Sequence, residues 1–271
     1  MAEAPQTKMR TISFLGGGRI TRALIAGLRL TGDRRPIVVY DRNRAKTELL
    51  QRELKTRIAR DLRDAIEHAD IVVVAVRPAS VAGLLDEMSK SGATLHLSVS
   101  LAAGIPLKNL RAALPRTRWV RAMPSPVCRV ARGLTALCFD QAVSKKDRAA
   151  VRAFFRQVGQ LVEVPEQQFD AFTATYSSSH GYHALAALAA AAQRAGLDQR
   201  TALTAAAHAL ADGIQYCRES GSSLDELLHE AATPGGIAAA TMTAMDKAGY
   251  GKVIHKGLAA GISQARLNAK R

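Results

Sequence analysis

Apolar and polar residues along the first part of the chain follow the patterns of strands and helices in turn. An apolar run at 10–15 leads directly into glycines and an apolar helix pattern, and further apolar runs cover 36–42 and 70–78. The run DIVVVAVRP at 70–78 is continuously apolar, as is typical of a strand buried on both faces of a parallel sheet. Shorter runs predict strands at 94–99, 118–122, 134–139 and 161–164. Strands that alternate with helices predict an α/β protein with a doubly wound, Rossmann-type sheet.

The pattern changes at Pro165. Beyond it the sequence is rich in Ala and Leu at helical spacing, and its breaks fall at Gly196, Gly221 and the Thr233-Pro-Gly-Gly turn. We therefore expect a dinucleotide-binding domain at 1–164 and an all-helical domain at 165–271. The small residues let helix backbones approach closely, and we expect such a domain to bury its apolar faces against a second copy, as a homodimer.

Composition and charge narrow the class of partner. Hydrophobic residues make up 48% and aromatic residues 4% of the chain, which is typical of a globular protein with an aliphatic core. The net charge is +15, and the excess lies wholly in residues 1–164, which hold 29 Lys+Arg and 14 Asp+Glu, whereas 165–271 hold nine of each. These charges are scattered along the predicted helices and few aromatic side chains are available to stack bases, so we expect no nucleic-acid partner.

The sequence predicts a cytoplasmic protein without a membrane segment or a metal site. The start, MAEAPQTKMR, lacks the apolar stretch of a signal peptide, and the longest apolar run, at 184–192, is too short to span a bilayer. The three cysteines are odd in number and have no metal-ligand spacing, which fits a reducing compartment. The histidines show no H-x-x-x-H spacing, so no metal is implied.

A glycine turn after the first predicted strand indicates a dinucleotide site. Gly16 and Gly18 follow the strand directly, and Arg19 and Ile20 open the next helix. Backbone approach to a pyrophosphate requires the absence of Cβ here, and the helix N-terminus supplies amide donors. The third small position of the motif is Thr21, which is larger than the usual Gly or Ala. The alternative is a glycine turn that merely reverses the chain.

The end of the second predicted strand carries two conflicting signals for the cofactor. Asp41 can hold a ribose 2′-hydroxyl, whereas Arg42, Arg44 and Lys46 favour a 2′-phosphate. Three cations within five residues, on the domain that carries the whole charge excess, favour NADPH, with NADH as the alternative. These basic side chains could also simply face solvent.

Several segments, taken in order, resemble the pyrroline-5-carboxylate reductase family. Its G-x-G-N-M-A turn resembles FLGGGRIT at 14–21, with Arg19 in place of Asn, and its V-K-P strand end resembles Val76-Arg77-Pro78. Its Ser-x-x-Ala-Gly-Ile segment is similar to 100–105. Its R-x-M-P-N-T-P-A loop resembles RAMPSPVC at 121–128, and its S-P-G-G-T-T turn resembles TPGGIA at 233–238.

This resemblance covers nearly the whole chain and implies a Rossmann domain, a helical dimerisation domain and a site between them. It implies NAD(P)H as hydride donor and a cyclic imino acid as substrate, reduced at C=N in proline biosynthesis. The implied cofactor-binding residues are Gly16, Gly18, Arg19, Ile20, Asp41, Arg42, Arg44, Val76, Arg77, Pro78, Ser100, Ala122, Met123 and Pro124. The implied residues for the substrate carboxylate are Thr233, Gly235, Gly236, Ile237 and Ala238.

The chain departs from the family mainly where the substrate would bind. Ser125 and Pro126 replace the Asn and Thr that contact the nicotinamide side in the family. The Ser-Gly-Ser-Gly-Pro segment corresponds to 176–180, where only Ser178 is retained. Ala238 replaces the Thr that the family places beside the imine nitrogen. The cofactor half resembles the family closely, whereas the substrate half differs.

Two features of the helical region could supply the missing chemistry. Tyr176 and His180 are candidate proton donors in place of the family Thr, with Ser178 beside them in sequence; alternatively, they cap or cover the start of a helix. The turn at 233–238 places Pro in a first helical turn with glycines that leave backbone amides accessible, which suits a carboxylate. It could also be a turn that only starts a helix.

Three functions are therefore weighed. The favoured one is an NADPH-dependent imine reductase of the pyrroline-5-carboxylate reductase type. The second is a reductase for a different imine or carbonyl compound. The third is a non-catalytic dinucleotide-binding homologue, which Pro126 and Ala238 keep open. A β-hydroxyacid dehydrogenase is disfavoured, because the helical region lacks the lysine and asparagine one turn apart that such enzymes use.

Overall fold

The computed structural model describes residues 11–67 and 69–270, which form two compact units. The first, here called the sheet unit, comprises the described residues up to Ala174 and those from Ile262 onwards. The second, the helical unit, comprises Thr175–Gly261. The helical unit is thus inserted into the sequence of the sheet unit. The first residue of the strand expected at 10–15, Arg10, lies outside the described residues.

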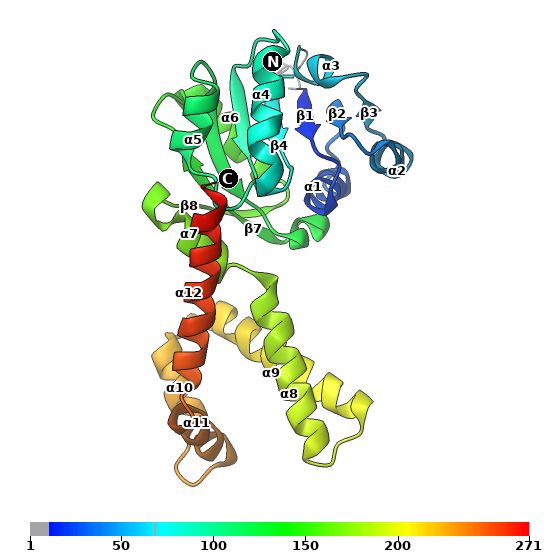
Figure 1. Cartoon of the computed structure of the whole chain (residues 1–271). Helices are drawn as coiled ribbons and strands as arrows, with labels where there is room; N and C mark the ends of the chain where they lie inside the picture. The colour runs from blue at the N-terminus through cyan, green and yellow to red at the C-terminus, as the bar shows by residue number, and fades with distance from the viewer. Residues whose placement is uncertain (1–10, 68, 271) are drawn as a thin grey trace, which may run out of the picture. The chain divides into compact units, whose positions relative to one another are not determined.

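A single eight-stranded sheet organises the sheet unit (Figure 1). Its strands are β1 (Ile12–Leu15), β2 (Ile37–Tyr40), β3 (Arg57–Ile58), β4 (Ile71–Val74), β5 (Leu97–Ser100), β6 (Arg118–Met123), β7 (Gly133–Phe139) and β8 (Gly159–Glu163). They lie in the order β3-β2-β1-β4-β5-β6-β7-β8. Neighbouring strands are parallel except β6 and β7, which are antiparallel. The strand order reverses between β1 and β4, where doubly wound sheets bind their ligands.

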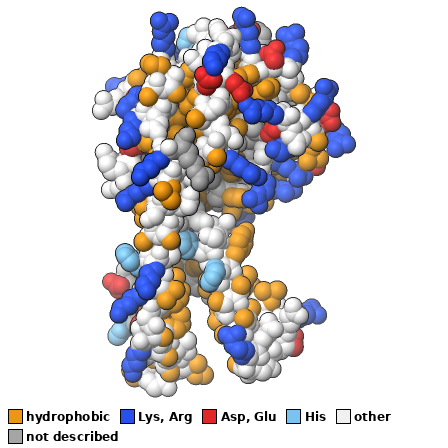
Figure 2. All heavy atoms as spheres, in the orientation of Figure 1, with side chains coloured by type: hydrophobic (Ala, Val, Ile, Leu, Met, Phe, Trp, Pro, Cys, Tyr) orange, Lys and Arg blue, Asp and Glu red, His pale blue; other side chains and the backbone are white. Residues whose placement is uncertain are grey.

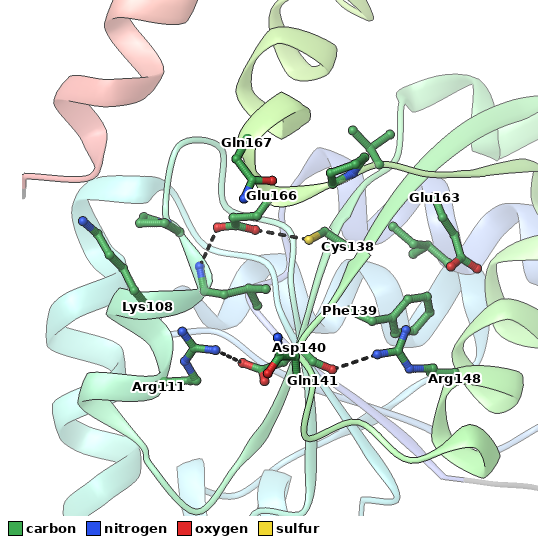
Figure 3. Close-up of a pocket in the computed structure, with 15 residues that line it drawn as sticks. Lys108, Arg111, Cys138, Phe139, Asp140, Gln141, Arg148, Glu163, Glu166 and Gln167 are labelled. Atoms are coloured by element: carbon green, nitrogen blue, oxygen red, sulfur yellow. Dashed lines mark hydrogen bonds and ion pairs between the residues drawn. The ribbon is translucent and has the colours of Figure 1, made fainter.

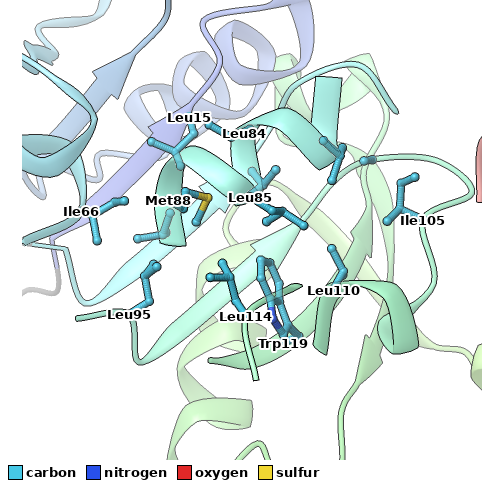
Figure 4. Packing of buried hydrophobic residues seen from close by; sticks show 14 of the residues in the cluster. Leu15, Ile66, Leu84, Leu85, Met88, Leu95, Ile105, Leu110, Leu114 and Trp119 are labelled. Atoms are coloured by element: carbon cyan, nitrogen blue, oxygen red, sulfur yellow. The ribbon is translucent and has the colours of Figure 1, made fainter. Parts of the chain in front are cut away.

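Helices cover both faces of the sheet, which explains the unbroken apolar run in β4. The helices are α1 (Arg19–Leu30), α2 (Arg44–Leu54), α3 (Leu62–Glu67), α4 (Val81–Lys90), α5 (Leu107–Ala113), α6 (Lys145–Arg156) and α7 (Glu166–Thr175). Residues of α3, α4, α5 and α7 share one buried cluster with the sheet, which includes Trp119 (Figure 4). Residues of α1, α2 and α6 share the other. Because helices cover both faces of the sheet, every β4 side chain is buried.

The helical unit is built from α8 (Ser178–Arg194), α9 (Gln199–Glu219), α10 (Leu224–Ala231), α11 (Ile237–Lys247) and α12 (Tyr250–Asn268). From Ile262 onwards α12 belongs to the sheet unit. Helices α8 and α9 pack together, and their buried residues are the small Ala189, Ala202 and Ala206. Side-chain caps begin α8, α9 and α10, from Ser177, Asp198 and Ser223.

The helical unit exposes much apolar surface in a single protomer (Figure 2). Large hydrophobic side chains are exposed along each of its helices, including Tyr182, Leu203, Leu228, Ile237 and Val253. Exposure of many large hydrophobic side chains is typical of a surface that associates with another protein. Within residues 11–67 and 69–270, no helix has the length and apolar character needed to cross a membrane.

The sequence-based fold class is confirmed, and the structure adds details that the pattern missed. The sheet is doubly wound, and the described residues after 165 form helices and the turns between them, without a strand. The run at 70–78 forms a strand only at Ile71–Val74, because Pro78 opens a 3₁₀ turn, Pro78–Ser80. The two-residue β3 was not predicted, because Arg57–Ile58 is too short to show a periodicity. Residues 165–174, which follow the change in pattern at Pro165, pack with the sheet unit.

Gly27 allows α1 to approach the 3₁₀ segment Pro126–Val130 closely. A Cβ built at Gly27 would lie 2.0 Å from the carbonyl oxygen of Cys128, so a larger residue would push the two backbones apart. Gly83, also inside a helix, has no described atom within 4 Å of such a Cβ. The two glycines therefore serve as a matched pair.

Gly27→Ala should destabilise the sheet unit by about 1–3 kcal/mol, because the added methyl overpacks the contact. Gly83→Ala should stabilise it by up to ~1 kcal/mol, because alanine favours a helix over glycine. Urea unfolding followed by the fluorescence of Trp119, the one tryptophan of the chain, measures both. Equal effects of the two substitutions would contradict the role of close packing at Gly27.

Candidate active site

The predicted cofactor residues meet at one edge of the sheet. Strands β1, β2, β4, β5 and β6 are parallel, so their carboxyl ends lie along the same edge. Each of these strands is followed by or ends in predicted site residues: 16–20 after β1, 41–44 after β2, 76–78 after β4, Ser100 in β5 and 122–124 at the end of β6. The structure thus brings together five segments that are far apart in the sequence.

The glycine turn after β1 has one crowded and one open position. Gly16 has φ +112°, and a Cβ there would lie 2.6 Å from the carbonyl oxygen of Ala75, so only glycine fits. Gly18, the N-cap of α1, has no described atom within 4 Å of its own Cβ position. Gly16 therefore serves the packing of β1 against β4, and Gly18 leaves space in front of the α1 N-terminus.

Thr21 holds the glycine turn in place from inside. Its side chain is fully buried, and its hydroxyl donates to the carbonyl oxygen of Gly16 over 2.6 Å. The third position of the motif, which is larger than usual, therefore closes the turn with a side-chain hydrogen bond. The sequence motif alone treats Thr21 as a departure, whereas the structure gives it a function.

Asp41 is bound to the protein backbone by both carboxylate oxygens. Its Oδ2 accepts from the amide of Gly17 over 2.8 Å, and its Oδ1 accepts from the amide of Asn43 over 2.8 Å. Lys46 Nζ lies 3.4 Å from Oδ2. Asp41 thus joins the end of β2 to the glycine turn. The exposed Arg42 and Arg44 pair with Glu87 and Glu48, respectively.

The remaining cofactor-side segments lie further along the same edge. Val76 and Pro78 are half-buried and Arg77 is exposed. Ser100 is buried, and its hydroxyl accepts from the amide of Ala102 over 3.3 Å. Ala122 and Pro124 are buried, and Met123 is half-buried.

The predicted catalytic residues lie at the start of α8 in the helical unit. Ser177 is the N-cap of α8, and its hydroxyl oxygen accepts from the amide of Ser179. Ser178 and His180 are exposed in the first turn, and Tyr176 is half-buried just before it. Ser177, and not His180, caps α8. Of the two structural roles considered for His180, capping the helix and covering its start, the first therefore does not apply.

The predicted carboxylate-binding residues form the entry to α11. The amide of Gly236 donates to the carbonyl oxygen of Thr233 over 2.9 Å, which closes the turn, and Gly236 is the N-cap. Ile237 is 89% exposed, and Ala238 is exposed as well. Among the described residues, no side chain caps this helix and no acidic residue occupies its first turn. Its first amides are therefore accessible to an anion.

Comparisons with known proteins agree on one family. A family model described as pyrroline-5-carboxylate reductase dimerisation matches residues 166–267, and one described as NADP oxidoreductase coenzyme F420-dependent matches residues 11–104. The chain is 31% identical to the pyrroline-5-carboxylate reductase of Mycobacterium tuberculosis over 269 residues, covering 89% of this chain and 91% of the relative. The chain belongs to the pyrroline-5-carboxylate reductase family.

Solved structures agree with this assignment. A pyrroline-5-carboxylate reductase from Coxiella burnetii matches with a TM-score of 0.86 and 26% identity, covering 97% of this chain and all of that one. Pyrroline carboxylate reductase from Plasmodium falciparum, solved with NADP bound, matches with a TM-score of 0.84 and 19% identity, covering 96% of this chain and 98% of that one. At the latter identity the match shows the fold alone.

Compared with the pyrroline-5-carboxylate reductase pattern, the departures at Ser125 and Pro126 have a local structural role here. Ser125 is buried, and its carbonyl oxygen accepts from the amide of Cys128 over 3.0 Å. Pro126 is the first residue of the 3₁₀ segment that packs against α1. The loop is therefore fixed by backbone geometry, where the family pattern has two polar side chains.

Sequence reasoning missed a charged cluster behind this loop. Arg121, in the strand that ends in Met123, is 2% exposed and pairs with Glu166 and Asp170 of α7. The sequence signal was an acidic pair four residues apart at the start of the helical region, but an i,i+4 acidic pair on a helix is usually solvated. The carboxylates became significant only once the structure placed them beside a buried guanidinium.

Glu166 also lines a pocket of about 790 Å³ between α5, α6, α7 and the end of β7 (Figure 3). Burial raises the pKa of Cys138 to about 12, and its hydrogen bond to Glu166 acts in the same direction, so this thiol is protonated at neutral pH. Arg111 pairs with Asp140 over 2.9 Å. Arg148 donates to the carbonyl oxygen of Asp140 over 3.1 Å. Within the lining, Arg111 and Asp140 thus pair with each other, whereas Glu166 and Glu163 pair with Arg121 and Arg152, respectively.

Proposed function

We propose that this protein is an NADPH-dependent reductase of a cyclic imino acid, with pyrroline-5-carboxylate as the substrate. The observation that carries the proposal is the glycine turn of the doubly wound sheet, with its open Gly18, in a chain that belongs to the pyrroline-5-carboxylate reductase family. The reaction adds a hydride to the carbon and a proton to the nitrogen of the C=N bond. The chain must therefore hold the dinucleotide, hold the imino acid and supply the proton.

The cofactor residues fit a dinucleotide with a 2′-phosphate. Gly18 leaves room for a pyrophosphate at the α1 N-terminus, and Arg19 is exposed beside it. Asp41 accepts two backbone hydrogen bonds and lies 3.4 Å from Lys46 Nζ, so its carboxylate fixes the end of β2 next to this site. The exposed Arg42 and Arg44 are suited to a 2′-phosphate. Bound at this edge, NADPH would supply the hydride.

The turn at 233–238 is the proposed site for the substrate carboxylate. The accessible amides at the α11 N-terminus and the absence of an acidic residue in its first turn, among the described residues, favour an anion. Thr233, Gly235, Gly236, Ile237 and Ala238 are assigned to this site. Backbone amides bind a carboxylate whatever the side chains are, so Ala238 is compatible with anion binding.

Tyr176 and His180 are the proposed proton donors, and Ser178 is the proposed third polar contact. Ala238 lacks the hydroxyl that the family pattern places beside the imine nitrogen, so another group must supply the proton to this nitrogen. Tyr176 and His180 flank the α8 cap and carry exchangeable protons. Ser178 is the serine retained from the family segment.

The helical unit is the proposed dimer interface. Residues 166–267 match the dimerisation model, and a lone protomer buries only small alanines within the α8–α9 pair. A second copy would cover exposed side chains such as Leu203 and Val253. The partners expected are thus a small-molecule substrate and a second copy of the chain. A cytoplasmic location and the lack of a nucleic-acid partner stay predictions.

Ala238 and Pro126 favour a second candidate, a reductase for a different imine. Both positions carry polar side chains in the family pattern and lack them here, so recognition around the reacting bond has changed. A buried polar partner discriminates substrates strongly, and its loss relaxes that discrimination. The same two positions keep open a homologue that binds the dinucleotide without turnover.

The purified protein should oxidise NADPH when supplied with pyrroline-5-carboxylate. Parallel assays with pyrroline-2-carboxylate and piperideine-2-carboxylate, read by the loss of NADPH absorbance, compare the two candidates. Turnover of the last two compounds alone would replace the proposed substrate with a different imine. NADPH binding without turnover of any of them would support a non-catalytic homologue.

The double substitution of Arg42 and Arg44 by alanine should raise the KM for NADPH by about 10- to 100-fold, because charge-assisted hydrogen bonds to a phosphate are lost. The KM for NADH should change by less than about threefold, since NADH lacks this phosphate. Arg52→Ala removes a charge from the last turn of α2, the helix that Arg44 begins, and is the matched control. Equal losses with both cofactors would contradict a 2′-phosphate site.

Replacing the true proton donor should lower kcat by about 100-fold or more, which is the usual range for general acid catalysis. Tyr176→Phe and His180→Gln test the two candidates separately. His183→Gln changes an exposed histidine one turn further along α8 and is the control. If Tyr176→Phe and His180→Gln both retain kcat within about threefold of the unmodified protein, neither residue is the proton donor.

A further inference from the structure

Arg121 is the most deeply buried charged side chain of the sheet unit described here. It is 2% exposed and lies in β6, where it pairs in register with Ser100 of β5 on one side and Cys138 of β7 on the other. Ser100 is a predicted cofactor contact. Two further predicted contacts, Met123 and Pro124, follow Arg121 by two and three residues in the chain. Arg121 therefore lies in β6 close to the sheet edge that carries the predicted cofactor residues.

Three residues of one face of α7 hold this guanidinium. Nη1 lies 3.0 Å from the Glu166 carboxylate, and Nη2 lies 3.1 Å from that of Asp170. The guanidinium carbon lies 4.3 Å from the ring centroid of Phe169, which is fully buried. Residues three and four apart share a helix face, so α7 can rotate or slide little without breaking at least one of these contacts.

Glu166 extends the same cluster to two further elements (Figure 3). Its Oε1 accepts from the amide of Leu107, the first residue of α5, over 2.8 Å, and its Oε2 accepts from the Cys138 thiol over 3.2 Å. The start of α7 is thereby tied to α5, β6 and β7 at once. Each of these contacts restricts the same short stretch of chain.

The returning connection from the helical unit is anchored on the same α5 segment. The Asn109 side chain donates to the carbonyl oxygen of Ala269 over 2.8 Å. A Cβ at Gly104 would lie 2.2 Å from the carbonyl oxygen of Ala265, so α12 approaches this loop as closely as glycine permits. Two chain segments, one leading to the helical unit and one returning from it, are thus both held by contacts with residues 104–109, next to the Arg121 cluster.

We propose that Arg121 is a positioning residue for the reduction: it holds α7, which leads directly into Tyr176 and His180, against the strand that carries Met123 and Pro124. This inference rests on the proposed function. A buried ion pair is weak evidence for stability, because desolvation offsets its attraction. Two carboxylates and a ring around one planar guanidinium instead fix the orientation of α7 and its distance from β6. Hydride transfer requires reacting groups that are held in a defined geometry.

The test compares Arg121→Lys with Arg118→Lys. Lysine keeps the charge but cannot contact two carboxylates and a ring through one planar group. Arg118 lies on the same strand and pairs over 3.1 Å with Asp147 of α6, so its replacement disturbs an ion pair that does not involve α7. For each variant, kcat, the KM for the imino acid, the dissociation constant of NADPH and the deuterium isotope effect with labelled NADPH are measured.

Arg121→Lys should lower kcat by about 10- to 100-fold, since small displacements of reacting groups have effects of this size. NADPH binding should change by less than about threefold, because the glycine turn and Asp41 are not part of the cluster. The isotope effect on kcat should rise as hydride transfer becomes slower than the other steps. Arg118→Lys should leave all four quantities within about twofold.

Glu166→Gln and Asp170→Asn repeat the test from the α7 side and cover the case in which Arg121→Lys fails to fold. These substitutions keep the size and an acceptor oxygen, so they should cause smaller losses of kcat in the same direction. An unchanged kcat, or parallel losses of kcat, NADPH binding and folded protein, would overturn the positioning role. An unmodified protein that reduces no imine would instead refute the proposed function.

Discussion

One carboxylate, that of Glu166, joins three elements of the sheet unit. It accepts from a helix amide, a buried guanidinium and a buried thiol, and these donors come from α5, β6 and β7. The group is half-buried, and these three donors satisfy its two oxygens. Removing its charge would leave Arg121 with Asp170 as its remaining carboxylate partner among the described residues. The antiparallel β6–β7 pair and the start of α7 therefore depend on the same small network.

The cofactor half of the site is constructed from backbone geometry, and this explains why it resembles the family so closely. Gly16 must be glycine because Ala75 lies against it, and Thr21 and Asp41 close the turn with hydrogen bonds to the main chain. Few side chains could replace these without moving β1 from β4. The helical unit carries fewer such constraints in one protomer, since Ala238 and His180 are exposed. Substitutions at these exposed positions do not disturb a core.

The fold could be predicted from the sequence because burial leaves a direct mark on composition. The DIVVVAVRP run and the loss of strand-like runs after Pro165 together indicate a two-faced sheet followed by helices. Side-chain hydrogen bonds to distant backbone leave no such mark. The hydrogen bond from the Gly17 amide to Asp41 joins residues that are 24 positions apart in the sequence. The two ion pairs of Arg121 join residues that are 45 and 49 positions apart. Sequence periodicity reports which face is buried, but it does not report which polar groups meet across that face.

The close approach of Ala265 to Gly104 also orders events in time. Ala103 and Gly104 lie in the part of the sheet unit that is synthesised first, yet Ala265 and Asn268, which contact them and belong to the same unit, are made after the whole of Thr175–Gly261. At 5–20 residues per second this interval lasts roughly 4 to 17 seconds. During it, the loop at Ala103 and Gly104 lacks its contacts with the end of α12 while the apolar helices of the helical unit are made. Completion of the nucleotide-binding fold and exposure of the association surface are thus coupled by the order of synthesis.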